Sequence, residues 1–198
     1  TQSRSSAASD VYKRQQIGEQ MIKDLANIWP EMKCIALRYF NPAGADHTGM
    51  NGENPINPPT ALVPYITQTA MGILPKLTVF GTDYDTRDGS CIRDYIHISD
   101  LALAHLLALD YLLEGKQIQP FDILNIGTGT GVTVLEAIEA FQRVTGMNLP
   151  YTLGKRRAGD VAAIYSSIQK ITNTIGWKPI KGIDEMMESA WRWQLRLK

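Results

Sequence analysis

The stretch Cys34-Ile35-Ala36-Leu37-Arg38-Tyr39-Phe40, followed by Asn41-Pro42, decides the fold class. It is a short, almost continuously apolar run that ends at a proline, which is typical of a buried parallel strand leading into a loop. The segment before it, residues 17–28, carries apolar side chains at helical spacing and ends at Pro30. A helix followed by a buried strand is half of a βαβ unit. We therefore expect residues 16–45 to form the last helix and strand of a Rossmann-type parallel sheet.

Strand and helix patterns alternate through residues 46–198. We expect strands over residues 77–80, 92–98 and 121–126, and helices over residues 61–71, 100–113, 133–146, 167–175 and 184–195. Thr133-x-x-Glu136 forms a capping box at one helix start. The predicted class is α/β, a C-terminal remnant of a Rossmann-type sheet plus a mixed α/β domain from which some segments return to that sheet.

Residues 1–15 are rich in Ser, Ala and Arg and carry no periodic apolar pattern. We expect this segment to be disordered. Its run Asp10-Val11-Tyr12-Lys13-Arg14-Gln15 resembles translated adapter sequence, which indicates a non-native leader.

Composition restricts the classes of partner. The 198 residues are 44% hydrophobic and 20% charged, and 20 Lys and Arg balance 20 Asp and Glu. Such a neutral chain has no field to attract nucleic acid, and no apolar run is long enough to span a membrane. We expect a cytoplasmic protein that binds neither. The spacing of Cys34 and Cys91, and of the three histidines, also predicts no metal site.

Gly127-Thr128-Gly129-Thr130-Gly131 lies between a predicted strand and a capped helix, as a dinucleotide fingerprint would. The fingerprint needs a third glycine where Val132 stands, and no strand ending in an acidic residue follows at the required distance. We therefore interpret the segment as a tight strand-to-helix turn.

Arg93 and the pair Arg156-Arg157 stand in loop or strand-end contexts. Each guanidinium group can donate to two phosphate oxygens at once. Two such sites could therefore hold a pyrophosphate even though the chain has no net charge. Taken singly, each is more often a surface or salt-bridged arginine, and spacing alone leaves both readings open.

Six motifs, in order along residues 17–198, closely resemble the UDP-glucose 4-epimerases of the extended short-chain dehydrogenase/reductase family. They are Arg38-Tyr39-Phe40-Asn41-Pro42-Ala43-Gly44-Ala45, Val79-Phe80-Gly81-Thr82-Asp83-Tyr84-Asp85-Thr86, Arg93-Asp94-Tyr95-Ile96-His97-Ile98-Ser99-Asp100-Leu101-Ala102, Asn125-Ile126-Gly127-Thr128-Gly129-Thr130-Gly131, Arg156-Arg157-Ala158-Gly159-Asp160 and Trp191-Arg192-Trp193-Gln194.

The resemblance implies a reaction. NAD in a Rossmann domain takes a hydride from C4 of a UDP-hexose while the Tyr of a Tyr-x-x-x-Lys pair removes the hydroxyl proton. The 4-keto sugar then turns over and takes the hydride back on its other face. Tight sugar contacts would favour the ground state, so the strong contacts are to UDP. The resemblance makes residues 46–198 mainly the UDP-sugar-binding domain, and implies a homodimer for full-length members through helices that include the one ending near Trp29.

The resemblance also assigns site residues. Phe40 matches a residue against the nicotinamide, and Asn41 a donor to the pyrophosphate or sugar. The uracil would meet Thr78, Val79 and Phe80, and the pyrophosphate Arg93 and Arg157, with Ala158 and Gly159 leading to Asp160, the acceptor of ribose hydroxyls. Taken singly, Phe40 and Phe80 could be core residues and Asp160 a turn residue.

Two positions depart from the family pattern. Many members have Asn-Asn-Leu where this chain has Thr60-Ala61-Leu62, so a side-chain contact is missing there, although backbone groups near Ala61 and Leu62 can still serve. Ile164 stands where members carry either a bulky Tyr, which excludes N-acetylated sugars, or a small residue, which admits them. Its intermediate size leaves that preference open.

No catalytic residue is assigned. Alignment with the family helix places the Tyr and Lys at Asp10 and Arg14, and neither side chain can act as the tyrosinate base or its lysine. We expect the chain alone neither to bind NAD tightly nor to epimerise. Two alternatives stay open, another NAD-dependent nucleotide-sugar epimerase or decarboxylase, and a non-catalytic UDP-sugar-binding module.

Overall fold

The computed structural model describes residues 7–197. The helices are α1 (Ala7–Ile28), α2 (Leu62–Ala70), α3 (Ile98–Leu113), α4 (Val134–Thr145), α5 (Gln169–Ile175) and α6 (Ile183–Arg196). The strands are β1 (Cys34–Tyr39), β2 (Asn41–Ala43), β3 (Leu77–Phe80), β4 (Ile92–Arg93), β5 (Tyr95–His97), β6 (Phe121–Ile126), β7 (Val132–Thr133), β8 (Tyr151–Gly154) and β9 (Ala163–Ile164). The expected α/β class is confirmed.

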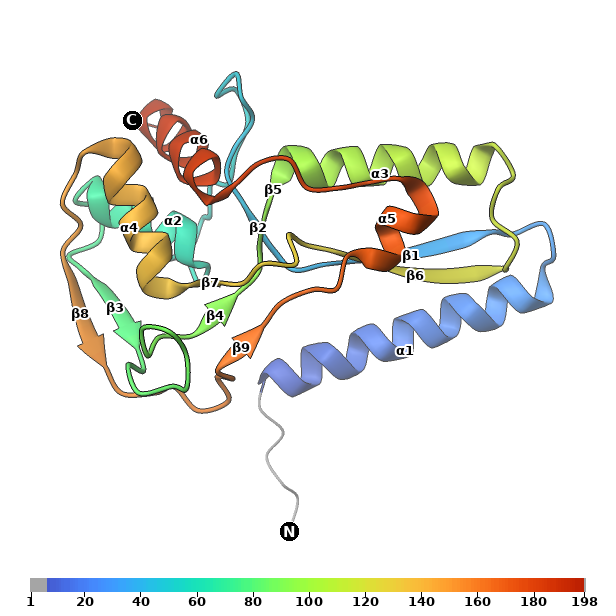
Figure 1. Cartoon of the computed structure of the whole chain (residues 1–198), viewed down its shortest axis with the longest axis horizontal. Coiled ribbons are helices and arrows are strands. Elements are labelled where there is room, and N and C mark those ends of the chain that lie inside the picture. The colour runs from blue at the N-terminus through green and yellow to red at the C-terminus, as the bar shows by residue number, and fades with distance from the viewer. Residues whose placement is uncertain (1–6, 198) are drawn as a thin grey trace, which may run out of the picture.

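A parallel pair of strands, β1 and β6, forms one half of the molecule (Figure 1). Cys34 is aligned with Phe121 and Tyr39 with Ile126. Helix α1 lies along one side of the pair and α3 along the other, and both contact β1. Leu124 and Ile126 of β6 are completely buried in the core of this half. Strand β6, from residues 46–198, thus pairs with β1, the strand that the sequence assigned to the Rossmann-type sheet.

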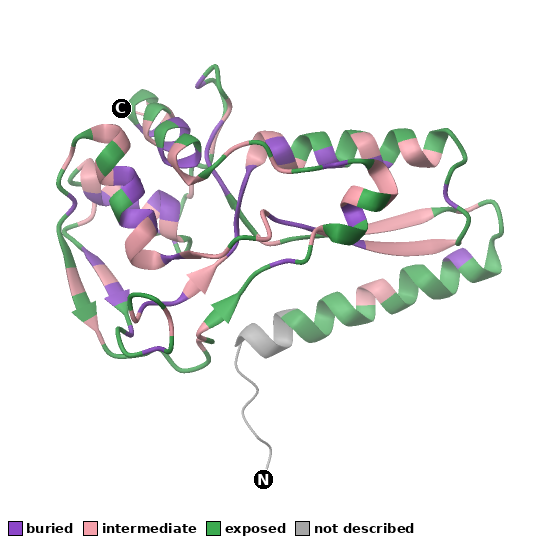
Figure 2. Ribbon diagram, in the orientation of Figure 1, coloured by how far each residue is buried: buried purple, intermediate pink, exposed green. Residues whose placement is uncertain are grey.

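The other half is a helical layer built on the β3–β8 pair. Helices α2, α4 and α6 turn their buried residues toward one another (Figure 2). Their shared core includes Ile66, Phe141 and Met187, all with no exposed surface. The ring of Phe141 meets that of Trp191 edge-on at 5.5 Å. This core holds β3 in place, and β3 carries three of the candidate site residues.

Two short sheets connect the halves. Strand β2 pairs with β5, and β4 pairs with β9 on one side and with β7 on the other. The expected single strand over residues 92–98 is divided, because the Asp94 side chain turns into the interior between β4 and β5. These small sheets bring the segments around residues 41, 93 and 164 together.

Local signals set several helix ends. The capping box is confirmed, since the Thr133 hydroxyl accepts from the Glu136 N–H and the Glu136 carboxylate accepts from the Thr133 N–H. Gly146 then ends α4 in the left-handed conformation, with φ of 69°. Helix α3 is capped by His97, whose Nδ1 accepts from the Ser99 N–H, and it begins two residues before the predicted start at residue 100.

One expectation about the N-terminal segment is wrong. Residues 7–15, predicted to be disordered, form the first turns of α1, because this stretch has no Gly or Pro and contains several strong helix formers. Residues 1–6 lie outside the described part of the chain. The prediction that residues 1–15 are a non-native leader stays a prediction.

The sequence also missed strands β8 and β9. Both are short and have exposed side chains, so neither shows an apolar run.

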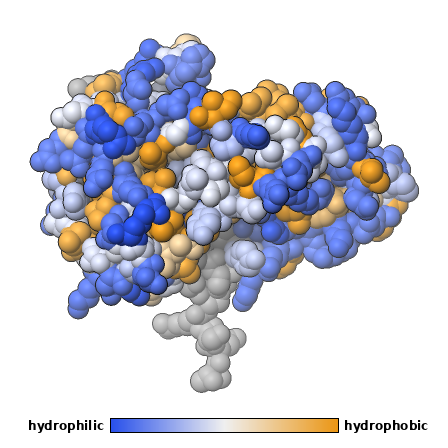
Figure 3. Space-filling view, in the orientation of Figure 1, coloured by the Kyte–Doolittle hydropathy of each residue, from blue (hydrophilic) through white to orange (hydrophobic). Residues whose placement is uncertain are grey.

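Figure 3 shows apolar and hydrophilic side chains interspersed on one face, with apolar surface along part of α3, where Leu103, Leu106 and Leu109 are exposed. None of the described helices is both long and apolar enough to cross a membrane.

Candidate functional site

Four residues that the sequence assigned to one ligand lie together. The Arg157 guanidinium donates to both carboxylate oxygens of Asp160, with Nε 2.9 Å from Oδ2. The Arg93 guanidinium approaches the same carboxylate, with its terminal nitrogen 3.7 Å from Oδ1. Arg157 also lies over the Phe80 ring, 5.0 Å from the centroid. Two cations, one carboxylate and one aromatic ring therefore form a single surface cluster, which we call the Arg93–Arg157 cluster.

Strand β3 presents its two faces to different surroundings. Val79 is buried in the core beneath α2 and α4, whereas Thr78 is partly exposed and Phe80 is exposed. Because side chains alternate along a strand, Thr78 and Phe80 share the outer face. Val79 can offer a ligand only backbone groups, and Phe80 can offer its ring.

Arg93 is held more firmly than Arg157. Its guanidinium donates to the backbone oxygens of Ile92 at 2.7 Å and Val161 at 3.0 Å, and its side chain is 19% exposed against 58% for Arg157. Ile164 lies opposite Arg93 in the β4–β9 pair, with a largely exposed side chain. The cluster thus joins Arg93, which backbone oxygens hold in place, and Arg157, which faces solvent. Ile164 lies next to Arg93.

Arg156, the neighbour of Arg157, has a different role. It lies over the Tyr84 ring, 4.1 Å from the centroid, and its Nε donates to Asp83 Oδ1 at 2.7 Å. That hydrogen bond lowers the pKa of the Asp83 carboxyl. Arg156 therefore ties the 83–84 loop to the end of β8, and leaves Arg157 as the arginine that faces the cluster.

Asp94, which the sequence analysis did not single out, receives an unusual set of hydrogen bonds. Its carboxylate has no exposed surface and accepts from the N–H and hydroxyl of Thr128, the N–H of Gly129, and the N–H and hydroxyl of Ser166. A Cβ on Gly127 would lie 2.3 Å from its Oδ2. The glycine turn therefore serves an internal carboxylate, and its N–H groups are not directed at a phosphate. The signal in the sequence was a glycine turn directly after a buried strand.

Four other predicted residues lie at the ends of β1, β2 and α2. Phe40 follows β1, and its N–H donates to the Ile126 oxygen. Asn41 begins β2, and its N–H donates to the Asp94 oxygen at 3.0 Å. Ala61 precedes α2 without a side-chain cap, and Leu62 packs against the helical core. In the described part of the chain, no hydrogen bond or ion pair joins Phe40, Ala61 or Leu62 to Arg93, Arg157 or Asp160.

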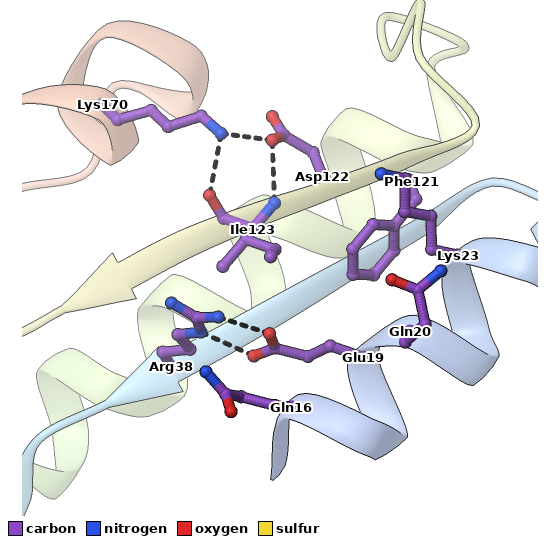
Figure 4. Close-up of a pocket in the computed structure, with 9 residues that line it drawn as sticks. All are labelled: Gln16, Glu19, Gln20, Lys23, Arg38, Phe121, Asp122, Ile123 and Lys170. Carbon is purple, nitrogen blue, oxygen red and sulfur yellow. Dashed lines mark hydrogen bonds and ion pairs between the residues drawn. The ribbon is translucent and has the colours of Figure 1, made fainter. Parts of the chain in front are cut away.

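A surface groove of about 400 Å³ lies elsewhere, between α1, the β1–β6 pair and α5 (Figure 4). Four of its five charged side chains form two pairs, Arg38 with Glu19 and Lys170 with Asp122. It contains none of the predicted site residues. Among residues 7–197, no group of three or more His, Cys, Asp or Glu side chains could hold a metal ion.

Comparison with known proteins identifies the family. Residues 16–190 match the family model described as GDP-mannose 4,6 dehydratase. This chain belongs to that family. The UDP-glucose 4-epimerase of Pasteurella multocida is 46% identical to this chain over 176 residues, which cover 89% of this chain and 51% of the relative. The chain thus spans about half the length of the curated relatives it matches.

Solved structures of UDP-glucose 4-epimerases confirm the fold. The UDP-glucose 4-epimerase of Stenotrophomonas maltophila, with bound NAD and formylated UDP-arabinopyranose, matches with a TM-score of 0.88 and 41% identity, over 92% of this chain and 53% of that chain. The enzyme of Bifidobacterium longum, in complex with NAD+ and UDP, matches with a TM-score of 0.84 and 39% identity, over 91% and 53%. The resemblance to UDP-glucose 4-epimerases drawn from the six motifs is confirmed.

Proposed function

We propose that this chain supplies the UDP-sugar site of an NAD-dependent epimerase that acts at C4 of a UDP-hexose. The observation that carries the proposal is the Arg93–Arg157 cluster, in which Asp160 and the Phe80 ring adjoin two guanidinium groups. The similarity to UDP-glucose 4-epimerases supports the identity of the ligand.

The chemistry of the cluster matches a nucleoside diphosphate. Guanidinium forks bind phosphate oxygens in pairs, so Arg93 and Arg157 would hold the pyrophosphate. Asp160 would then exchange part of its contact with Arg157 for the ribose hydroxyls. The exposed Phe80 ring and the backbone of Thr78 and Val79 would receive the uracil.

The remaining residues would complete the site around this core. Ala158 and Gly159 connect the second arginine to Asp160, and Gly159 has a positive φ of 90°, which a side chain would strain. Backbone groups near Ala61 and Leu62 would approach the sugar nucleotide, and Asn41 would donate to the pyrophosphate or sugar. We assign no metal to the site.

Among the described residues, Phe40 is the one that we assign to NAD binding. The N–H groups of Thr128 and Gly129 in the glycine turn donate to Asp94, so these two groups are not available to a dinucleotide phosphate. The resemblance would place the family Tyr and Lys at Asp10 and Arg14. We propose that NAD binding and hydride transfer belong to the rest of the parent enzyme, that the parent is a homodimer, and that the 198 residues alone do not turn over.

Titration calorimetry of the purified chain with UDP tests the site. We expect Arg157→Ala to weaken binding about 10- to 100-fold, because it removes charge-assisted hydrogen bonds to phosphate. Arg143→Ala is the matched control, since Arg143 forms a two-point surface pair with Asp184 on α6. Absence of UDP binding by the unmodified chain, or equal affinity of both variants, would contradict the proposal.

Ile164 would set the preference for the sugar. Its largely exposed side chain lies beside Arg93, where a bulky residue would restrict and a small one would admit an N-acetyl group. Titrating UDP-glucose against UDP-N-acetylglucosamine measures the preference of the chain. Ile164→Ala should shift the preference toward the N-acetylated sugar. An unchanged ratio of the two affinities would show that Ile164 does not set the preference.

A further inference from the structure

Asp94 connects three segments that carry proposed site residues. It directly follows Arg93, and its side chain is buried while Arg93 points to the cluster. Its backbone oxygen accepts from the N–H of Asn41. Its Oδ2 accepts from the N–H of Ser166 at 2.9 Å and from the Ser166 hydroxyl at 2.6 Å. Ser166 lies two residues beyond β9, at the end of the segment that contains Arg157, Asp160 and Ile164.

Apart from the Arg93–Asp160 ion pair and the packing of Arg157 over the Phe80 ring, few other contacts hold residues 157–164 in position. The hydrogen bonds from this segment to β4 are those of the two-residue β4–β9 pair, of the Ile92 N–H with Ala162 and of the Arg93 guanidinium with Val161. The side chains of β9 are exposed and add no core packing. The Asp94–Ser166 contact is therefore the buried anchor at one end of the segment.

The geometry around the anchor has no free space. A Cβ on Gly127 would lie 2.3 Å from Asp94 Oδ2 and 2.4 Å from Ser166 Oγ. A buried carboxylate that accepts five hydrogen bonds from neutral donors has one low-energy position, because any displacement leaves a charged oxygen without a partner. The position of Ser166 relative to Arg93 is thereby determined by Asp94.

We propose that Asp94 is a positioning residue that fixes residues 157–164 relative to Arg93, so that affinity for a nucleoside diphosphate depends on a contact that the ligand does not reach. Its effect on binding rests on the proposed function, whereas its effect on the segment does not. Asp94 acts through Arg93 and Ser166 and touches no substrate.

The chain offers a matched pair of variants. Ser166 Oγ and Thr128 Oγ1 each donate to the Asp94 carboxylate at 2.6 Å, but only Ser166 belongs to the segment next to the cluster. Ser166→Ala removes the hydroxyl hydrogen bond of the anchor of residues 157–164 and leaves the backbone N–H of residue 166 as its remaining donor to Asp94. Thr128→Val removes an equally short hydrogen bond on the side of the glycine turn and keeps the shape of the side chain.

Amide hydrogen exchange of the ligand-free chain tests the positioning directly. We expect peptides covering residues 157–165 to exchange at least about fivefold faster in Ser166→Ala and at the unmodified rate in Thr128→Val. If residues 157–165 exchange at the same rate in the two variants, whether that rate is faster than in the unmodified chain or the same, the proposal is overturned. If Ser166→Ala does not unfold cooperatively, Ser166→Cys keeps a weak donor, and faster exchange in that variant supports the proposal while unchanged exchange overturns it.

Titration with UDP tests the consequence. Ser166→Ala should bind about tenfold more weakly, and Thr128→Val should stay within about twofold of the unmodified chain. A loss of affinity that is the same in both variants indicates a merely structural Asp94 and overturns the proposal. If the unmodified chain does not bind UDP, the proposed function fails, and hydrogen exchange still decides whether Asp94 positions the segment.

Discussion

The guanidinium of Arg157 lies against the carboxylate of Asp160, with donor–acceptor distances of 2.9 and 3.3 Å. The two residues are three positions apart in a segment outside any helix, and the Arg157 side chain is 58% exposed. Solvent screens such a pair, so it orients the two groups more than it stabilises the fold.

Arg157→Ala should therefore leave the fold almost unchanged. We expect the free energy of unfolding, measured with urea, to fall by less than about 1 kcal/mol. Arg143→Ala, which removes a comparable surface pair with Asp184, should behave alike. A loss of more than about 2 kcal/mol would mean that Arg157 supports the structure, and that its effect on UDP binding cannot be ascribed to ligand contact.

Two glycine-to-alanine substitutions should have opposite effects. Gly127→Ala places a methyl group against the Asp94 carboxylate and the Ser166 hydroxyl, so we expect a loss of about 2 kcal/mol or more in the free energy of unfolding. Gly18 lies within α1, with no atom within 4 Å of an added Cβ. Gly18→Ala should stabilise the helix by about 0.5–1 kcal/mol. Urea denaturation measures both, and a destabilised Gly18→Ala would contradict the described position of α1.

His97 should make stability depend on pH near neutrality. Burial, helped by Lys181, lowers the pKa of the buried His97 ring below its ordinary value of 6.5. The ring is neutral in the fold, because Nδ1 accepts from the Ser99 N–H and Nε2 faces the Ser189 hydroxyl at 3.1 Å. The unfolded chain therefore binds the proton more readily, and stability that is complete above about pH 6.5 should decrease as the pH falls below it.

His97→Asn provides the comparison for that pH dependence. Asparagine keeps an acceptor for the Ser99 N–H but has no group that titrates in this range. Urea midpoints between pH 5 and pH 8 should decrease toward acid in the unmodified chain and stay flatter in the variant. Identical pH profiles would exclude His97 as the source.

Glu136 should contribute in the acid range. A side-chain hydrogen bond from Arg87, together with the Thr133 N–H, lowers the pKa of its carboxyl to about 2. The folded state therefore favours the ionised form, and this stabilisation is present above pH 4.5 and lost as the pH falls toward 2.

Glu136→Ala removes both the capping box and the pair with Arg87. We expect it to lower the free energy of unfolding at pH 7 by about 1–2 kcal/mol and to flatten the acid limb of the stability profile. Glu139→Ala, three positions further along α4 and outside the capping box, is the control. Equal losses in the two variants would contradict a specific role for Glu136.

Much of the fold could be predicted because its signals are local. The strands at residues 77–80 and 121–126 have the predicted bounds, since each is a short apolar run between turn residues. The α4 capping box is likewise local, because its two partners are three residues apart. Strands β8 and β9 had no such signal, since pairing with β3 and β4 makes them strands.

The candidate site divides in the same way. Its residues could be named from motifs that resemble a family, and the fold brings Arg93 next to Asp160, which lies with Arg157 in a separate segment. Asp94 could not be identified as an anchor, because its donors lie 34 and 72 residues away in the chain. The role of a buried carboxylate depends on which donors surround it, and only folding decides that.

The sequence by itself determined the α/β class, the caps, the neutral charge and the residue types available to a phosphate ligand, because periodicity and side-chain chemistry are properties of short stretches. The tertiary structure alone decided that Arg156 binds the 83–84 loop, that Val79 is core while Phe80 is surface, and that the glycine turn surrounds a carboxylate. Each of these depends on contacts between segments far apart in the chain, whose free energy exists only once the segments are packed together.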